Sequence, residues 1–286
     1  MISGETKVLG VIGHPVGHTC SPAMHNAALA ALGLDCVYVA FHVRPNELER
    51  AIAGMRGLGI GGLNVTVPHK VGVMAHLDEI SEEARAIGAV NTIANRDGWL
   101  SGYNTDAYGV MESLRQEGGL ERLPPKVVLL GAGGAARAIL YALLQCDEVE
   151  EIALLNRTVE KAEALAGDLD PAATKVRVGG LERRTDIRET GLLINSTSVG
   201  MHPDADTSPV EDADALHDGL LVLDIVYNPL QTQLMCQAVA RGARALNGLG
   251  MLVFQGARSF EIWTGRKPPT EVMKDAALQR FGPAQT

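Results

Sequence analysis

Three glycines stand where they could bind a phosphate. Gly131, Gly133 and Gly134 directly follow the apolar run at 127–130 and precede a helical stretch beginning near Ala135. The first glycine permits a tight turn, the next lets backbone approach a pyrophosphate, and the N–H groups and dipole of the helix attract that anion. Ala136 replaces the usual third glycine, an accepted variant. A plain strand-to-helix turn is the alternative, but strand, turn and helix agree on dinucleotide binding.

The residues after the next apolar run indicate which dinucleotide binds. An acidic side chain at this place would hold the ribose 2′-hydroxyl of NAD, but the sequence reads Asn156-Arg157-Thr158. Arg157 can bind a 2′-phosphate, Thr158 can donate to it while capping the next helix, and Lys161 lies one turn further on. The pattern favours NADP. Without the glycine turn, an ordinary surface Arg and Lys beside a helix start would be the better interpretation.

The first half of the chain carries polar residues where strands should end. They lie in the segments GHPVGHTCSPAMHN, GLNVTVPHK, GAVNT and GYNTDAYG. Polar groups at the carboxyl ends of strands face the crevice in which α/β proteins bind their ligands. A ligand site is therefore expected in this half as well.

The elements that must position these residues alternate between strand-length apolar runs and helical stretches. This alternation predicts an α/β fold with a mainly parallel sheet. In the first half we expect a helix over Ser21–Leu32, with Ser21 as N-cap and Gly33 as its stop, and another helix capped by Ser81. The segment Asn95–Gly98 predicts a hairpin turn. The expected strands there are 7–12, 37–42, 63–67, 89–94 and 99–103.

The second half restarts the alternation at Lys126. Strands are expected at 127–130, 151–155, 175–178, 192–195, 221–225 and 243–246, with helices over 135–144 and 158–169. Two further helices, 252–264 and 270–279, follow the last strand. The pattern changes near Asn104 and again near Gly250, so we place domain boundaries there.

Composition excludes several classes of protein. The 286 residues carry a formal charge of −9 without any Lys/Arg-rich run, so nucleic acid and anionic membranes are poor partners. No apolar run approaches the roughly 20 residues of a membrane span, and the start lacks the layout of a signal peptide, so we expect a cytoplasmic protein. Cys20, Cys36, Cys146 and Cys236 form no CxxC pair, which favours reduced thiols over disulfides or a metal site.

The ordered motifs resemble the shikimate dehydrogenase (shikimate/quinate dehydrogenase) family. The first-half segments above are joined in the second half by GAGGAARA, NRT, NSTSVGM, DIVYNP and GLGMLVFQ, and the resemblance runs from about Gly10 to Gln255. It implies an oxidoreductase that reversibly reduces 3-dehydroshikimate to shikimate with NADPH, in the chorismate pathway of aromatic amino-acid biosynthesis. It also implies a discontinuous substrate-binding and catalytic domain (1–104 and 250–286), a Rossmann-type NADP-binding domain (105–249), and an active site in the cleft between them.

The resemblance also assigns residues. The catalytic pair would be Lys70 and Asp106. The substrate would be bound by Thr19, Ser21, Asn64, Thr66, Lys70, Asn91, Asp106, Tyr227 and Gln255. NADP would be bound by Gly131, Ala132, Gly133, Gly134, Ala135, Asn156, Arg157, Thr158, Lys161, Ser196, Thr197, Ile225, Gly248 and Met251. Thr19 replaces the first serine of the family's HSxSP motif. Because it adds a methyl group, quinate stays open as a substrate.

Lysine and aspartate suit this reaction. Hydride delivery to a ketone builds alkoxide charge, so a proton donor such as the Lys70 ammonium must sit within about 3 Å of the carbonyl oxygen, where Asp106 can orient it. Taken singly, however, Lys70 is more typical of a solvated lysine and Asp106 of a helix N-cap. Hydride transfer needs no covalent intermediate, so Cys20 is expected to be a neighbour and not a nucleophile.

Alternatives remain at this stage. One is a quinate/shikimate dehydrogenase with relaxed cofactor use, and another is a catalytically silent regulator that binds NADP or shikimate. The spacings of the histidines fit no zinc site, so they are expected to shape loops or bond backbone groups; these are His14, His18, His25 and His69. Both a monomer and a homodimer are compatible with the sequence.

Overall fold

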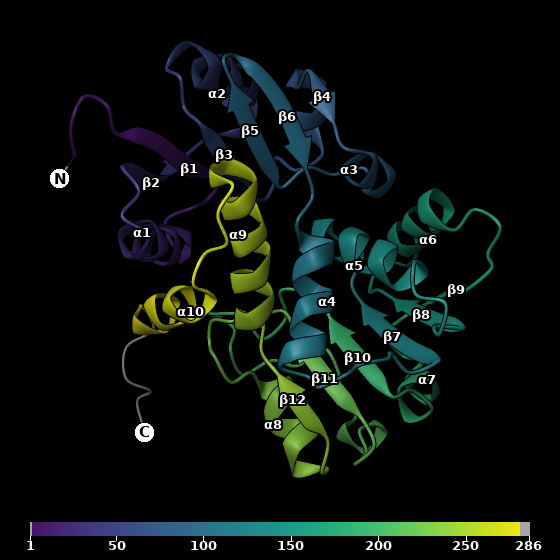
Figure 1. Ribbon diagram of the computed structural model, residues 1–286. Helices are drawn as coiled ribbons and strands as arrows, with labels where there is room; N and C mark the ends of the chain where they lie inside the picture. Colours follow the sequence, from purple (N-terminus) through teal and green to yellow (C-terminus); the bar gives the residue numbers. More distant parts are fainter. Residues whose placement is uncertain (1, 281–286) are drawn as a thin grey trace. The chain divides into compact units, whose positions relative to one another are not determined.

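The computed structural model of the chain describes residues 2–280, apart from the side chains of residues 184 and 185. It divides into two compact units. One, called here the discontinuous unit, consists of Met1–Gly109 and Val253–Thr286, and the other, the continuous unit, of Val110–Leu252. The chain passes between them within α4 (Asp106–Gln116) and α9 (Leu249–Thr264), close to the two places where the sequence pattern changes. Each unit has its own six-stranded sheet (Figure 1).

The discontinuous unit has a mainly parallel sheet in the order β2-β1-β3-β5-β6-β4. Strand β1 pairs in parallel with β2 and β3, and β4 pairs in parallel with β6, whereas β5 is antiparallel to both of its neighbours. The strands are β1 (Lys7–Gly13), β2 (Cys36–His42), β3 (Gly62–Val65), β4 (Glu79–Ile80), β5 (Thr92–Arg96) and β6 (Trp99–Tyr103). The helices, besides α9, are α1 (Ser21–Ala31), α2 (Leu48–Gly57), α3 (Glu82–Ile87) and α10 (Thr270–Gln279).

Aliphatic side chains hold this unit together. Ile12, Val65 and Ile93 of the strands are buried against Ile52 and Met55 of α2, and full burial of each such side chain contributes about 1.5–3 kcal/mol. The predicted hairpin between β5 and β6 is confirmed. Asp97 and Gly98 have φ of 53° and 88°, the left-handed pair that a two-residue hairpin turn of this kind requires.

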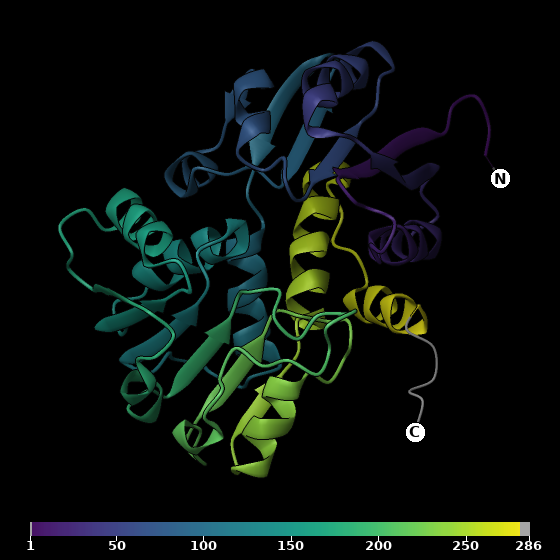
Figure 2. The same cartoon turned by 180° about the vertical axis from the view of Figure 1, so that it is seen from behind.

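The continuous unit has a fully parallel sheet in the order β12-β11-β10-β7-β8-β9. The chain runs outward from β7 through β8 to β9, then crosses back to β10 and continues outward to β12, which is the doubly wound order of dinucleotide-binding domains. The strands are β7 (Lys126–Leu130), β8 (Glu151–Leu155), β9 (Val176–Gly179), β10 (Leu192–Asn195), β11 (Leu221–Asp224) and β12 (Arg244–Leu246). The helices are α5 (Gly134–Leu144), α6 (Val159–Leu169), α7 (Arg184–Arg188) and α8 (Gln233–Ala240), of which α8 packs beside β11 and β12 (Figure 2).

Several local predictions are confirmed and others are wrong. Ser81 caps α3 by accepting from the Ala84 amide at 3.2 Å, and Gly33 follows α1 with φ of 62°. Ser21 is not an N-cap, because α1 already includes it and its hydroxyl accepts from Thr19 Oγ1 at 3.1 Å. Thr158 occupies the N-cap position of α6, but its side chain makes no capping hydrogen bond.

Some predicted boundaries shift. The expected strand 89–94 begins only at Thr92, since the Val90 amide donates instead to the Lys70 carbonyl at 2.8 Å. The expected strand 63–67 ends at Val65. Helix α8 was not expected at all; Thr232 begins it by accepting from the Met235 amide at 3.3 Å.

Candidate active site

Lys70 and Asp106 meet in the discontinuous unit. The Lys70 ammonium lies 2.6 Å from Asp106 Oδ2, and the two side chains are 15% and 8% exposed. Asp106 is the first residue of α4, where the helix dipole favours a negative charge. The pair therefore combines a charge-assisted hydrogen bond with limited access to water. The Asp106 carboxylate orients the Lys70 ammonium group, which can act as a proton donor.

Uncharged neighbouring residues hold Asp106 in place through its side chain and its backbone. Asn91 donates to Asp106 Oδ1 at 2.9 Å, and the Asp106 amide donates to Asn104 Oδ1 at 3.0 Å. Asn91 is held in turn by Thr105, whose amide donates to Asn91 Oδ1 at 2.8 Å. All four residues are buried, apart from a few per cent of exposed surface. Asp106 consequently has donors on both oxygens and a single orientation.

Asn64 lies in a second, connected cluster of hydrogen bonds. Its Oδ1 accepts from the Tyr38 hydroxyl at 2.7 Å, and its amide nitrogen lies 3.0 Å from Ser259 Oγ and 3.2 Å from Thr92 Oγ1. A third acceptor, the Asn91 carbonyl, is also 3.2 Å from this nitrogen. Because the two amide hydrogens already face three acceptors, Asn64 offers a ligand its Oδ1 atom. Tyr38 and Ser259 were missed by sequence analysis, since their partners are distant in the chain.

The remaining predicted substrate residues fall in both units. Thr19 and Ser21 are hydrogen-bonded to each other in the discontinuous unit, and Thr66 follows β3 with its side chain half-buried. Gln255 Oε1 lies 3.4 Å from Asn91 Nδ2, which brings α9 to the cluster around Asp106. Tyr227 belongs to the continuous unit. The structure thus gathers Asn64, Lys70, Asn91, Asp106 and Gln255 around connected hydrogen bonds.

The glycine turn of the continuous unit lies at the carboxyl end of the central strand β7. Gly131 has φ of 106°, and a Cβ there would lie 2.7 Å from Ser196 Oγ, so both conformation and space require glycine. Gly133 is the N-cap of α5 and is exposed, and a Cβ on it would meet no atom within 4 Å. The N-terminus of α5 is therefore open to an anion.

The residues predicted to select the cofactor follow the adjacent strand β8. Arg157, Thr158 and Lys161 are exposed, and Asn156 stabilises their turn by donating to the Thr158 carbonyl at 2.7 Å. Strand β8 pairs with β7, so this turn and the glycine turn end neighbouring strands of one sheet. Two cations and a hydroxyl in this position fit a ribose 2′-phosphate.

The other predicted cofactor residues follow β10, β11 and β12. Ser196 Oγ donates to the Leu130 carbonyl at 2.6 Å, immediately before the glycine turn. Gly248 approaches the segment after β11 so closely that a Cβ would lie 1.9 Å from the Ile225 carbonyl oxygen. Met251 is buried. Asp224, which the sequence motif DIVYNP contains without an assigned role, is fully buried, and burial raises the pKa of its carboxyl group.

The histidines differ from one another. As expected, His69 bonds a backbone group, since its Nε2 lies 2.8 Å from the Val43 carbonyl oxygen. His14 instead contacts another side chain, with its Nδ1 2.5 Å from His42 Nε2. The expectation is wrong for His25. It is fully buried and stacked on the Tyr38 ring, neither ring nitrogen has a hydrogen-bond partner among residues 2–280, and burial lowers its pKa to about 3. Cys20 is buried, which raises the pKa of its thiol.

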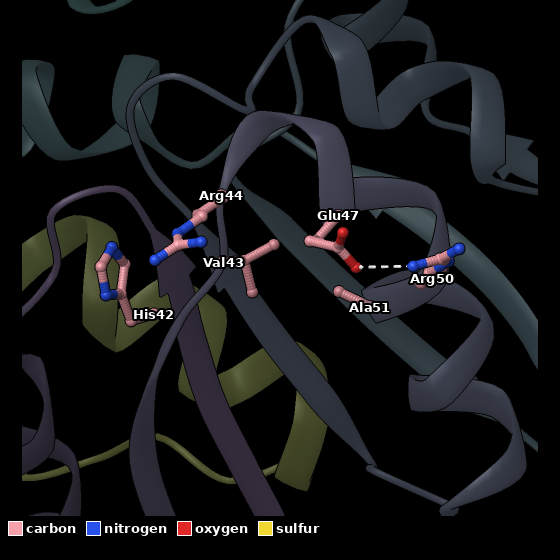
Figure 3. A pocket seen from close by; sticks show the side chains of 6 residues that line it. All are labelled: His42, Val43, Arg44, Glu47, Arg50 and Ala51. Carbon is pink, nitrogen blue, oxygen red and sulfur yellow. Dashed lines mark hydrogen bonds and ion pairs between the residues drawn. The ribbon is translucent and has the colours of Figure 1, made fainter.

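An open cavity of ≈ 500 Å³ lies beside the start of α2 (Figure 3). It is lined by His42, Val43, Arg44, Glu47, Arg50 and Ala51. Glu47 pairs with Arg50 at 3.3 Å, and none of the predicted site residues lines it. In the part of the chain that the structure describes, no group of three His, Cys, Asp or Glu side chains could hold a metal ion, and no helix is long and apolar enough to cross a membrane.

The architecture defines a class: two-domain α/β proteins in which a Rossmann-type unit is inserted into a second α/β unit. Comparisons with known proteins narrow this class. Residues 11–93 match the shikimate dehydrogenase substrate binding domain, 118–229 match shikimate / quinate 5-dehydrogenase, and 248–278 match the shikimate 5′-dehydrogenase C-terminal domain.

Individual proteins agree over nearly the whole chain. The chain is 48% identical to the shikimate dehydrogenase (NADP⁺) of Methanopyrus kandleri, covering 98% of each sequence. A crystal structure of a shikimate dehydrogenase in complex with NADP⁺ superposes with a TM-score of 0.92 at 45% identity, covering 99% of this chain and 98% of that one. The enzyme from Thermus thermophilus in complex with NADP(H) and shikimate gives 0.86 at 39% identity, covering 96% and 99%. The chain belongs to the shikimate dehydrogenase family.

Proposed function

We propose that this protein catalyses the reversible, NADP-dependent reduction of 3-dehydroshikimate to shikimate. The observation that carries the proposal is the Lys70–Asp106 pair, with its 2.6 Å hydrogen bond and its carboxylate held from the other side by Asn91. It stands in a chain whose relatives at nearly half identity are named shikimate dehydrogenase (NADP⁺). A protein that only bound these ligands would not need an oriented proton donor.

The residues of the continuous unit fit the cofactor. The open N-terminus of α5 suits the pyrophosphate, and Arg157 with Lys161 suits the 2′-phosphate. Ser196, Thr197, Ile225, Gly248 and Met251 are proposed to border the nicotinamide. When bound, NADPH supplies the hydride.

The proton is handled by the discontinuous unit. As the hydride reaches the ketone carbon, Lys70 donates a proton from Nζ to the oxygen that becomes the alkoxide, so a hydroxyl group forms. Asp106 holds Nζ in place and stabilises its positive charge before the transfer. In the direction of oxidation, the neutral lysine takes the hydroxyl proton.

The substrate is proposed to bind through hydroxyl and amide groups. Asn64 offers Oδ1, while Thr19, Ser21, Thr66, Asn91, Gln255 and Tyr227 complete the proposed contacts. Thr19 adds a methyl group at a position where the family has serine. This observation keeps quinate as a second candidate substrate, because the same strip is proposed to contact the carboxylate end.

One assay tests these alternatives. The absorbance of reduced nicotinamide is followed with shikimate or quinate, each with NADP⁺ or NAD⁺. The proposal expects the highest kcat/KM for shikimate with NADP⁺. A higher value for quinate, or equal use of NAD⁺, would favour the broader quinate/shikimate dehydrogenase. No absorbance change in any combination, with both ligands still bound in calorimetry, would replace the proposal by a binding protein.

A further inference from the structure

Asp224 and Asn195 occupy matching places in the continuous unit. Each is the last residue of its strand, β11 and β10 respectively, and the two are register partners in the parallel pair. Both are 0% exposed. Their side chains therefore lie where β10 and β11 end, at the carboxyl edge on which an α/β sheet binds its ligands.

The Asp224 carboxylate accepts hydrogen bonds from the end of β10 and from the segment that follows β11. Its Oδ1 accepts from Asn195 Nδ2 at 2.9 Å and from the Val226 amide at 3.1 Å, and its Oδ2 accepts from Thr232 Oγ1 at 2.7 Å. Asn195 passes the constraint on, since its Oδ1 accepts from the Thr197 amide at 3.0 Å and from Thr197 Oγ1 at 2.7 Å. One buried carboxylate thus fixes both the backbone that follows β10 and the backbone that follows β11.

The two fixed segments carry residues of the proposed nicotinamide site. Ser196 and Thr197 follow β10, and Ile225 and Tyr227 follow β11. The segment that follows β11 is also contacted by Gly248. The Gly248 amide donates to the Val226 carbonyl at 3.0 Å, and the backbone of Gly248 lies so close to Ile225 that a Cβ on Gly248 would be 1.9 Å from the Ile225 carbonyl oxygen. A small rotation after either strand would displace these side chains together.

We propose that Asp224 is a positioning residue, which sets the two segments 196–199 and 225–227 in the geometry that binds the nicotinamide end of the cofactor. The inference rests on the proposed function. Its physical reason is the pattern of donors. Asn195 Nδ2, the Val226 amide and the Thr232 hydroxyl all point at one buried group, and without it two N–H groups would be left buried and unpaired. Such groups reorient or recruit water.

Replacement of Asp224 separates its shape from its charge. In Asp224→Ala all three bonds are lost. In Asp224→Asn the oxygen can keep the bonds to Asn195 and Val226, while the amide donates to Thr232, whose hydroxyl can accept. Affinity for NADPH is measured directly by its fluorescence on binding, so the result does not depend on turnover. We expect Asp224→Ala to weaken binding about tenfold or more, because two buried N–H groups lose their acceptor. We expect Asp224→Asn to restore the affinity to within about threefold.

A second pair of variants covers the case in which Asp224→Ala does not fold. Thr232→Val keeps the shape of the side chain but removes the hydroxyl that donates to Asp224 and caps α8, and Thr232→Ser keeps that hydroxyl as the matched control. We expect Thr232→Val to raise KM for NADPH more than it lowers kcat, with Thr232→Ser close to the original protein. If Asp224 and Thr232 had a merely structural role, the variants would have a lower melting temperature, but their NADPH affinity and their KM for NADPH, both measured well below that temperature, would be unchanged. That result would overturn the inference. If the original protein bound NADPH but turned over neither shikimate nor quinate, the proposed reaction would fail while the binding test of Asp224 still stood.

Discussion

Lys70 and Asp106 are joined by a hydrogen bond of 2.6 Å, and the carboxylate oxygen that Lys70 does not contact is held by Asn91 at 2.9 Å. The ammonium group is therefore oriented by a carboxylate that has little freedom of its own. A lysine in this setting differs from the solvated lysine that its sequence context alone would indicate.

Replacing Lys70 by alanine should remove the proton donor. We expect turnover with shikimate and NADP⁺ to fall by about 100- to 10,000-fold, the usual contribution of a positioned acid or base. Calorimetry should show shikimate still binding with similar affinity. Lys267→Ala changes an exposed lysine of the same unit and should keep full turnover. Near-normal turnover in Lys70→Ala would exclude this lysine as the donor.

Asp106→Asn should also cause a large loss of turnover, since the neutral amide no longer stabilises the lysine charge. The double variant Lys70→Ala/Asp106→Asn should lose less than the product of the two single losses, because the residues act as one unit. The kcat values of the four proteins test this directly. Losses that multiply would mean that the two groups act independently.

Arg157→Ala should affect NADPH much more than NADH. The guanidinium is proposed to bind the 2′-phosphate, which NADH lacks, and a hydrogen bond to a charged group is worth about 1.5–3 kcal/mol, or roughly tenfold or more in KM. The Michaelis constants for both cofactors provide the measurement. Arg177→Ala, which removes another exposed arginine of this unit, is the control. Equal changes for NADPH and NADH would remove Arg157 from the phosphate site.

His25 should make the fold sensitive to mild acid. Its pKa is about 3 in the folded protein and 6.5 in the unfolded chain, so below pH 6.5 only the unfolded chain takes up the proton. This lowers the free energy of unfolding by up to about 1.4 kcal/mol for each pH unit between 6.5 and 3. Urea unfolding at pH 7, 6 and 5 should therefore show a shallower decline in His25→Phe, which keeps the ring stacking. His202→Phe, at an exposed histidine, should keep the original slope. Identical slopes in the original protein and His25→Phe would contradict the assignment.

The ionised Asp170 side chain should stabilise the continuous unit, and this stabilisation should be lost in strong acid. Burial opposes its charge, but bonds from the amides of Thr174, Lys175 and Val176 and from the Thr174 hydroxyl outweigh this effect and lower its pKa to about 2. The stabilisation is fully present above pH 3.8 and is lost as the pH falls through about 2. Asp170→Asn should cost about 2 kcal/mol at neutral pH, because its amide would face donors. Chemical unfolding measures this, with the exposed Asp147→Asn as control; equal stabilities would refute it.

Local patterns were sufficient to predict most of the fold. Strands β7, β8, β10 and β11 of the continuous unit each contain an unbroken apolar run, as expected for a parallel sheet covered on both faces, and Gly131 marks the turn after the central strand β7. The hairpin after β5 could be predicted because Asp97-Gly98 is a residue pair that two-residue hairpin turns strongly prefer. Ser21 was assigned wrongly because a serine before a helix and a serine within its first turn have the same local sequence.

The internal geometry of the candidate site could not be predicted in this way. The resemblance to the shikimate dehydrogenase family identified Lys70 and Asp106 as a pair. Tyr38 and Ser259, however, act through Asn64, which is distant from both in the chain, and no local signal marks such a partner. Asn64 and Ser259, for example, are 195 positions apart. His25 was misread for the same reason: its surroundings are the rings of Tyr38, Phe260 and Trp263, two of them from α9.

The division of one unit between two stretches of chain dictates the order in which the protein can be completed during translation. The ribosome finishes the whole continuous unit before it makes Val253–Thr286. Only then does Ser259 become available to Asn64, and the Trp263 indole to the Ile93 carbonyl, which it reaches at 2.9 Å. A nascent chain that ends at Leu252 thus holds all six strands of the continuous unit, whereas its discontinuous unit still lacks most of α9 and the whole of α10, which packs against α1. That half-finished unit is where a chaperone would find exposed apolar surface.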